Sequence, residues 1–168
     1  MLPEEIADKV KFSRVTLTGG EPLIHADVKT LIDLLLWRGI EVNIETNGAA
    51  DISEFVTNDE NLFFTIDYKL PSSGECDKML WSNFVKLQKR DVVKFVIGSD
   101  EDVEKMREIV LKLKSELPKM PHIFAGVVFG QYEPSELVNR IISDEALHDV
   151  RLQLQIHKII WAPDERGV

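Results

Sequence analysis

The chain has 168 residues, of which 44% are hydrophobic and 29% charged, values typical of one soluble globular domain. Its formal net charge of −9 argues against a nucleic-acid or anionic-membrane partner, because either would require a basic face. The one cysteine, Cys76, excludes an internal disulfide and fits a reducing compartment. We therefore expect a single cytoplasmic domain over residues 1–168.

Apolar and β-branched runs predict strands, and helical patterns separate them. The predicted strands span residues 14–18, 40–45, 62–67, 92–97, 122–129 and 150–156. The predicted helices span residues 27–38, 51–56, 76–88, 100–117 and 134–142, and residues 157–168 are expected to be irregular. Strands that alternate with helices imply an α/β fold with a parallel sheet, either doubly wound or an arc of a barrel.

Polar or glycine-rich segments follow the predicted strands. They are Thr18–Pro22, Glu45–Gly48, Asp67–Lys69, Gly98–Asp100 and Gly130–Gln131. Turn chemistry alone explains any one of these loops. Acids recur at the same end of several strands, however, and ligands bind at the carboxyl ends of parallel strands. The set therefore favours a ligand site.

The double glycine Gly19-Gly20 invites comparison with a phosphate-binding loop. No Lys-Ser/Thr pair follows it, and the Glu21 carboxylate would repel a phosphate. An acid at this place suits an ammonium group, a ribose hydroxyl or a sulfonium-bearing ligand. The segment therefore predicts a cationic, amino-acid-like ligand.

Two further features each allow two interpretations. Polar residues alternate with apolar ones in the last predicted strand, which is either an edge strand with one face in water or the wall of a cavity. Lys94, inside an apolar strand, either reaches solvent or enters a polar interior. The polar residues of the last strand are Arg151, Gln153, Gln155 and His157.

The remaining histidines and the cysteine give no sign of a metal site. His25, His122 and His148 have no partner at metal-ligand spacing, and we interpret them as ordinary surface or core residues. Cys76 is interpreted as a non-catalytic thiol. We therefore expect no metal ligand among them.

Thr18–Pro22 resembles the glycine-glycine-glutamate-proline motif of the radical S-adenosylmethionine superfamily. Three further segments resemble the 7-carboxy-7-deazaguanine synthase family, and the likeness covers essentially the whole chain. The first motif is shared across the superfamily, whereas the last segment is the most specific to this family. The three segments are Glu45–Gly48, Asp67–Gly74 and Gln153–Trp161 with the closing Arg166–Val168.

The resemblance implies a partial (βα) barrel and a carbon–nitrogen lyase of queuosine (7-deazapurine) biosynthesis. Its reaction would convert 6-carboxy-5,6,7,8-tetrahydropterin to 7-carboxy-7-deazaguanine by radical chemistry. The implied cofactors are S-adenosylmethionine, a 4Fe-4S cluster and Mg²⁺. The implied partners are the pterin substrate and an electron donor such as flavodoxin or ferredoxin, and the resemblance also allows a homodimer.

Carried over by motif, the resemblance also implies residue roles. Glu21 would support the methionine ammonium group, and Thr18, Gln155 and His157 would lie along the pterin. The residues expected around S-adenosylmethionine are Gly19, Gly20, Glu21, Asn47, Asp67, Tyr68, Lys69 and Ser99.

The sequence departs from the family in its cysteines. The family holds its cluster with a C-x₃-C-x₂-C segment ahead of the double glycine, and here no cysteine precedes Gly19. We therefore expect the first strand and the cluster loop to be absent and this chain to be inactive alone. One interpretation is an enzyme without its cluster-binding segment, and another is a cluster-less module that binds S-adenosylmethionine or another metabolite. A generic α/β enzyme acting on a polar metabolite is the third.

Overall fold

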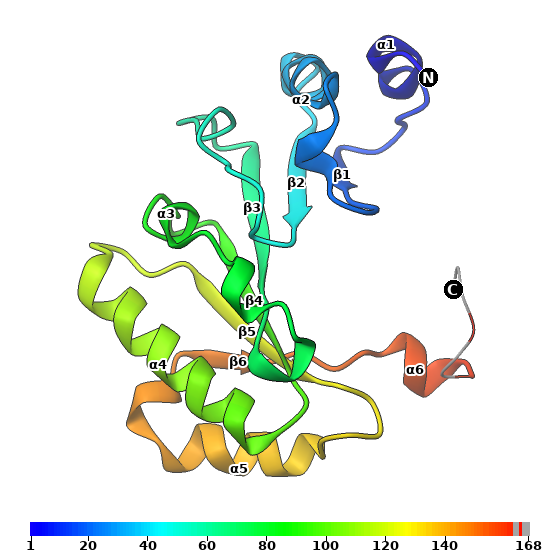
Figure 1. Cartoon of the computed structure of the whole chain (residues 1–168). Coiled ribbons are helices and arrows are strands. Elements are labelled where there is room, and N and C mark those ends of the chain that lie inside the picture. Colours follow the sequence, from blue (N-terminus) through cyan, green and yellow to red (C-terminus); the bar gives the residue numbers. More distant parts are fainter. Residues whose placement is uncertain (163–164, 166–168) are drawn as a thin grey trace.

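The computed structural model describes residues 1–162 and 165, and one parallel sheet of six strands lies at its centre (Figure 1). The strands are arranged in chain order, and each pairs in parallel with the next one along the chain. A doubly wound sheet requires a point where the strand order reverses, so that alternative is wrong. The sheet instead forms an open arc, as in part of a barrel. Its strands are β1 (Arg14–Leu17), β2 (Glu41–Thr46), β3 (Leu62–Tyr68), β4 (Val92–Ile97), β5 (His122–Val127) and β6 (Val150–Leu152).

Helices cover the convex side of this arc, where Figure 1 shows α2, α4 and α5. Four short 3₁₀ turns, Pro22–Ile24, Pro71–Ser73, Cys76–Lys78 and Glu145–Leu147, lie in the connections. Among the described residues, no helix combines the length and apolarity needed to cross a membrane. The helices are α1 (Pro3–Ala7), α2 (Val28–Trp37), α3 (Trp81–Phe84), α4 (Asp100–Glu116), α5 (Pro134–Ser143) and α6 (His157–Ile160).

The strands separate an apolar side from a polar side. Buried and half-buried residues alternate along β2, β3 and β4 because successive side chains point to opposite faces. In β4, Val93, Phe95 and Ile97 are fully buried. The residues between them, Lys94 and Val96, belong to the opposite, concave face. Burial of each large apolar side chain contributes roughly 2 kcal/mol, so the convex face stabilises the arc and the concave face is left for polar groups.

The strongest sequence patterns are confirmed. Strand β4 has the predicted bounds, and α4 buries the predicted stripe against the sheet. The Ser99 hydroxyl caps α4 by accepting a hydrogen bond from the Asp102 N–H at 3.3 Å. Gly39 has a φ of +72° just after α2, the left-handed conformation that commonly ends a helix. The buried stripe consists of Val103, Met106, Val110 and Leu113.

The predicted helix over residues 51–56 is wrong, because a distant side chain holds this segment in turns. Asn83 is fully buried, and its amide nitrogen donates to the carbonyls of Gly48 at 3.1 Å and Ala50 at 2.7 Å. Its amide oxygen accepts from the Ile52 N–H at 3.2 Å. These backbone groups are therefore not available for a helix.

Two other predicted elements are also wrong in extent. The helix expected over residues 76–88 is reduced to the 3₁₀ turn Cys76–Lys78 and α3. The last strand ends at Leu152 rather than at residue 156, and β5 ends at Val127 rather than at residue 129. Residues 157–160, expected to be irregular, form α6. The predicted motif at 166–168 lies outside the described residues.

Candidate functional site

Three hollows lie at the carboxyl-terminal side of the sheet, where the sequence predicts a ligand. The β1 hollow, of about 440 Å³, lies beside β1 and includes Thr18 and Gly19. The β3 hollow, of about 360 Å³, is lined by Asp67, Tyr68, Lys69 and other residues. The β6 hollow, of about 320 Å³, includes Gln155 and His157. The predicted site is therefore spread over neighbouring strand ends.

The β3 and β6 hollows adjoin each other. Lys94 and Val96 of β4 line both of them. The structure thus brings three of the residues expected around S-adenosylmethionine, Asp67, Tyr68 and Lys69, next to the hollow that Gln155 and His157 line. Gly19 lies in the β1 hollow, and the other four, Gly20, Glu21, Asn47 and Ser99, line neither the β3 nor the β6 hollow. Thr18 also lies in the β1 hollow and is not grouped with Gln155 and His157.

Glu21 joins the end of β1 to the end of β2. Its Oε1 accepts from the Thr46 hydroxyl at 2.9 Å, and its Oε2 accepts from the Asn47 N–H at 2.9 Å. Oε1 also accepts from the Leu23 N–H at 3.2 Å and caps the 3₁₀ turn. A carboxylate has about four acceptor positions, so Oε2 keeps capacity for a further donor such as an ammonium group.

The two glycines ahead of Glu21 adopt conformations that other residues rarely take. Gly19 has a φ of +98° and Gly20 a φ of +58°. No atom would lie within 4 Å of a Cβ built on either residue, so the constraint is the backbone conformation and not crowding. Both glycines are exposed, and their main chain is open to a ligand.

Charged side chains of alternating sign cross the concave face. Lys94 Nζ lies 3.5 Å from Glu45 Oε1 and 3.8 Å from Asp67 Oδ1. Lys69 Nζ lies 3.4 Å from Asp67 Oδ2. Asp67 Oδ1 is buried and has no hydrogen-bond partner among the described residues. A buried acceptor is normally paired, so this oxygen is suited to a hydroxyl or amine of a ligand.

Two predicted cofactor residues take structural positions. The Tyr68 ring packs in the core, with its centroid 5.2 Å from that of Phe84 and 5.6 Å from that of Phe95. Burial raises the pKa of the Tyr68 hydroxyl to about 12, so the group stays neutral at physiological pH. Any contact with a ligand in the β3 hollow would come from the Tyr68 backbone. Ser99 caps α4 through its hydroxyl.

Gln155 and His157 follow the point where β6 leaves the sheet. Gln153 N–H donates to the Ala125 carbonyl at 2.8 Å, and the chain then turns into α6. Together with Gln153, these two residues line the β6 hollow. The structure therefore has features of both interpretations: β6 is an edge strand, the polar residues of this segment are exposed, and three of them line a hollow.

The sequence reasoning missed Glu45 and left Lys94 open. Lys94 pairs with two carboxylates on the concave face, so it enters a polar interior. Asp67 and Lys94 are direct neighbours in the β3–β4 register. The period-2 alternation of β2, β3 and β4 could have placed all three residues on one face. Their pairing depends on the strand register, which the sequence did not provide.

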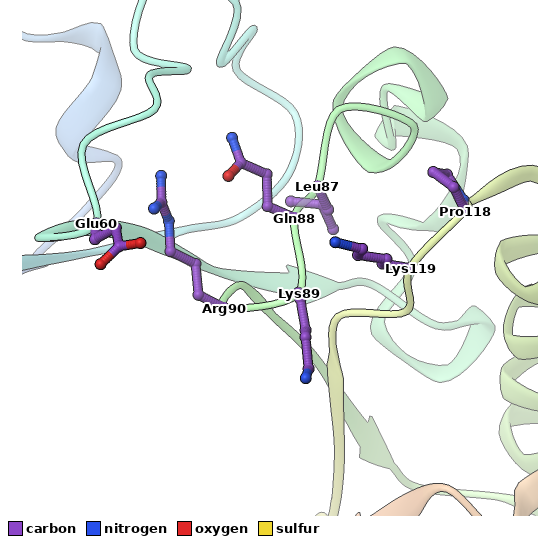
Figure 2. Close-up of a pocket in the computed structure, with 7 residues that line it drawn as sticks. All are labelled: Glu60, Leu87, Gln88, Lys89, Arg90, Pro118 and Lys119. Carbon is purple, nitrogen blue, oxygen red and sulfur yellow. The ribbon is translucent and has the colours of Figure 1, made fainter.

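A hollow larger than these three lies at the opposite edge of the sheet (Figure 2). It measures about 560 Å³ and is formed by segments that precede β3, β4 and β5. Lys89 and Arg90 point away from each other in this view, and Arg90 Nη2 donates to the Thr57 carbonyl at 2.9 Å. Because its cations do not converge, we do not place the ligand site there.

The residues of this chain fit one implied cofactor better than the others. Asp67 Oδ1, which accepts no hydrogen bond among the described residues, and the free acceptor capacity of Glu21 suit the hydroxyl and ammonium groups of S-adenosylmethionine. A 4Fe-4S cluster requires several thiolates, and the sequence contains one cysteine. No group of three His, Cys, Asp or Glu residues that could hold a metal ion occurs within residues 1–162 and 165. These residues therefore do not supply the thiolates that the cluster requires.

Known proteins share both this sequence and this fold, although no protein-family model matches the chain. The 7-carboxy-7-deazaguanine synthase of Clostridium acetobutylicum is 42% identical over the whole chain, which spans 76% of that protein. The synthase of Chlorobaculum tepidum is 36% identical over 92% of the chain, which spans 68% of that protein.

Solved structures agree in fold. QueE from Escherichia coli gives a TM-score of 0.64 at 25% identity, over 88% of this chain and 58% of QueE. SuiB from Streptococcus suis, solved with S-adenosylmethionine, gives a TM-score of 0.63 over 92% of this chain and 44% of SuiB. At 14% identity, SuiB supports the fold alone.

The open parallel arc and its strand-end motifs define a core of the radical S-adenosylmethionine superfamily. Within that superfamily, the extent of sequence identity is decisive. The chain belongs to the 7-carboxy-7-deazaguanine synthase family.

Proposed function

We propose that this chain provides the S-adenosylmethionine and pterin sites of a 7-carboxy-7-deazaguanine synthase. The observation that carries the proposal is the pair of adjoining hollows that share Lys94 and Val96. A reaction between two small molecules requires their reacting groups to be held side by side. The β3 hollow would hold S-adenosylmethionine, and the β6 hollow would hold 6-carboxy-5,6,7,8-tetrahydropterin.

The β3 side of the site would orient the cosubstrate by its polar groups. Asp67 Oδ1 would accept a ribose hydroxyl, since this oxygen is buried and lacks a partner among the described residues. Glu21 Oε2 would accept from the methionine ammonium group in addition to the Asn47 N–H. Lys69 would keep the Asp67 carboxylate in place through its contact at 3.4 Å.

The β6 side of the site would recognise the pterin edge. Gln155 offers one acceptor and two donors, and His157 offers a ring nitrogen in either role. Such groups match the alternating donors and acceptors of an aminopyrimidinone ring. Bound S-adenosylmethionine supplies a radical precursor in this superfamily, and the chain's own part is to orient both molecules and exclude water.

A second candidate function is a binding module without redox chemistry. The observation that favours it is the cysteine count of one, since a single thiolate cannot hold the family's cluster. The module would keep the strand-end sites and would not turn over the pterin. An external electron donor and a homodimer belong only to the enzyme proposal.

Calorimetric titration of the purified chain with S-adenosylmethionine tests the common part of both functions. We expect saturable binding, weakened about tenfold or more in Asp67→Asn, because a charged acceptor contributes about 1.5–3 kcal/mol. Asp33→Asn, on the exposed side of α2, is the matched control and should bind like the wild type. Absence of heat at millimolar ligand would contradict a preformed site.

Anaerobic incubation of the chain, fused to the cluster-binding segment of a curated relative, with S-adenosylmethionine, the carboxylated tetrahydropterin and a strong reductant separates the two functions. Formation of 7-carboxy-7-deazaguanine, followed by chromatography, would support the enzyme. Ligand binding without product, with and without added iron and sulfide, would support the binding module.

A further inference from the structure

Asp102 is a fully buried carboxylate that the proposed binding groups do not include. It lies in the first turn of α4, but its acceptor bonds go to two loops. Oδ1 accepts from the Ser72 N–H at 2.9 Å, and Oδ2 accepts from the Gly98 N–H at 2.7 Å. Oδ2 also forms a short hydrogen bond with the Ser72 hydroxyl.

These two loops follow adjacent strands at the ligand edge. Ser72 belongs to the 3₁₀ turn after β3, and Gly98 directly follows β4. Ser72 also lines the β3 hollow, together with Gln131 from the segment after β5. One carboxylate therefore fixes the separation of two strand ends beside the proposed cosubstrate site.

The two loops approach so closely that a side chain at Gly98 would require its neighbours to shift by a few tenths of an ångström. A Cβ built on Gly98 would lie 3.0 Å from the Ser72 hydroxyl oxygen and 3.2 Å from Gln131 Oε1. The hydrogen bonds to Asp102 hold the loops at this spacing. Among the described residues, no other hydrogen bond ties the Ser72 backbone to β4.

A buried carboxylate is stable only where donors replace its lost hydration. Asp102 has these donors in the two N–H groups and the hydroxyl. Removing the charge weakens all of these bonds together, because hydrogen bonds to a charged acceptor are the stronger kind. The loop connection therefore depends on the charge of Asp102 and not only on its shape.

We propose that Asp102 is a positioning residue for S-adenosylmethionine: it joins the loop at Ser72 to the turn at Gly98 and so sets the form of the β3 hollow. This inference rests on the proposed function, since it assumes that the β3 hollow holds the cosubstrate. Asp102 touches no ligand in this arrangement, and it acts through Ser72 and Gly98.

Calorimetric titration of the full chain with S-adenosylmethionine tests this role in three variants. Asp102→Asn should weaken binding about tenfold or more, because its amide NH₂ would face backbone donors. Ser72→Ala removes one of the three bonds and should weaken binding by about threefold. Asp100→Asn is the matched control in the same turn of α4, since that exposed carboxylate contacts Tyr132 and Arg140 instead.

Hydrogen exchange supplies a readout that general destabilisation would not produce. In Asp102→Asn the amides of Ser72 and Gly98 should exchange faster, while those of β2 stay protected. Saturating S-adenosylmethionine should restore part of the lost protection, since a ligand and a residue that order the same loops are linked. Uniformly faster exchange with no ligand effect would reduce Asp102 to a structural residue and overturn the proposal.

The binding outcomes distinguish the positioning role of Asp102 from the proposed function of the chain. If the wild type binds and Asp102→Asn binds as well as Asp100→Asn, the positioning role is wrong and the proposed function stands. If the wild type does not bind S-adenosylmethionine, both are wrong.

Discussion

At both ends of the sheet, a carboxylate connects neighbouring segments by accepting hydrogen bonds from their backbone, but the surroundings of the two ends differ. At the amino-terminal end, the buried carboxylate of Asp91 accepts from the N–H groups of Phe64 at 2.9 Å and Gln88 at 2.6 Å. At the carboxyl-terminal end, Glu21 and Asp102 likewise bridge segments from different strands. All three carboxylates replace water with backbone donors, so the physical chemistry is shared.

The difference lies in what surrounds each bridge. In the hollow adjacent to Asp91, Lys89 and Arg90 point away from each other (Figure 2). Near Asp102, Ser72 lines the β3 hollow together with Asp67, whose buried Oδ1 accepts no hydrogen bond among the described residues. Beside Glu21, Gly19 and Pro22 line the β1 hollow. The same bond therefore serves stability at one end and, in our proposal, ligand positioning at the other.

The largest effect on stability is expected at the amino-terminal end, from Asp91→Ala. Two N–H groups would lose their acceptor at a site that is 3% exposed, which costs about 3 kcal/mol of unfolding free energy. Urea denaturation measures this loss. Glu60→Ala, at an exposed carboxylate of the same end, should change little. A loss no greater than that of the control would contradict the role assigned to Asp91.

Glu21→Gln tests the role of the carboxylate at the carboxyl-terminal end of the sheet. Gln keeps one acceptor oxygen but places an NH₂ group near Thr46 or Asn47, so we expect a loss of about 1–2 kcal/mol in urea denaturation. Binding of S-adenosylmethionine should also weaken about tenfold, because the ammonium group loses its charged acceptor. The matched control is Glu41→Gln, whose carboxylate pairs with Arg14 at the other end of the sheet. Equal effects of both variants on ligand binding would remove the distinction between the two ends.

Lys94→Met should have a smaller effect on stability, of about 1 kcal/mol, because its ion pairs are long and partly exposed. The substitution leaves the carboxylates of Glu45 and Asp67 without their shared cation. Thermal denaturation should therefore show a salt-sensitive loss, partly recovered at high ionic strength. Lys29→Met, which removes an exposed pair with Asp33 on α2, is the control and should cause little loss. A loss that is independent of salt would indicate that packing, not charge, is the role of Lys94.

The smallest effect is expected at Asp144, far from either set of loops. The Ala146 N–H and then the Arg107 side chain lower the pKa of its carboxyl below the ordinary 3.8. A lowered folded pKa contributes stability that is present above the unfolded pKa and is lost as the pH falls through the folded pKa. The stability difference between the wild type and Asp144→Asn should therefore narrow from pH 6 toward pH 2–3. A difference that is unchanged over this range in urea denaturation would contradict the assignment.

The sequence predicted the parts of the fold that depend on local periodicity. The stripe of α4, its Ser99 cap and the body of β4 are local patterns, and the structure has them as expected. Residues 51–56 could not be predicted in the same way, because Asn83 lies about thirty positions away and takes their backbone groups. Tertiary contacts override local preference in that segment.

The candidate site was predictable to the level of the strand ends. Parallel topology alone places Glu21, Asn47 and Asp67 at one edge of the sheet. The pairing of Lys94 with Glu45 required the strand register, and the role of Asp102 required contact with Ser72, thirty residues earlier. Neither signal is present in the spacing of residues along the chain.

The shared position of Lys94 between the β3 and β6 hollows has a thermodynamic consequence. If a ligand in one hollow accepts a hydrogen bond from Lys94 Nζ, that group is less available to a ligand in the other hollow. Two ligands in the adjoining hollows would therefore not bind independently. Whatever factor the first ligand applies to the affinity of the second, the second must apply to the first. One side chain in a shared wall thus makes each ligand's affinity depend on the presence of the other, whichever of the two binds first.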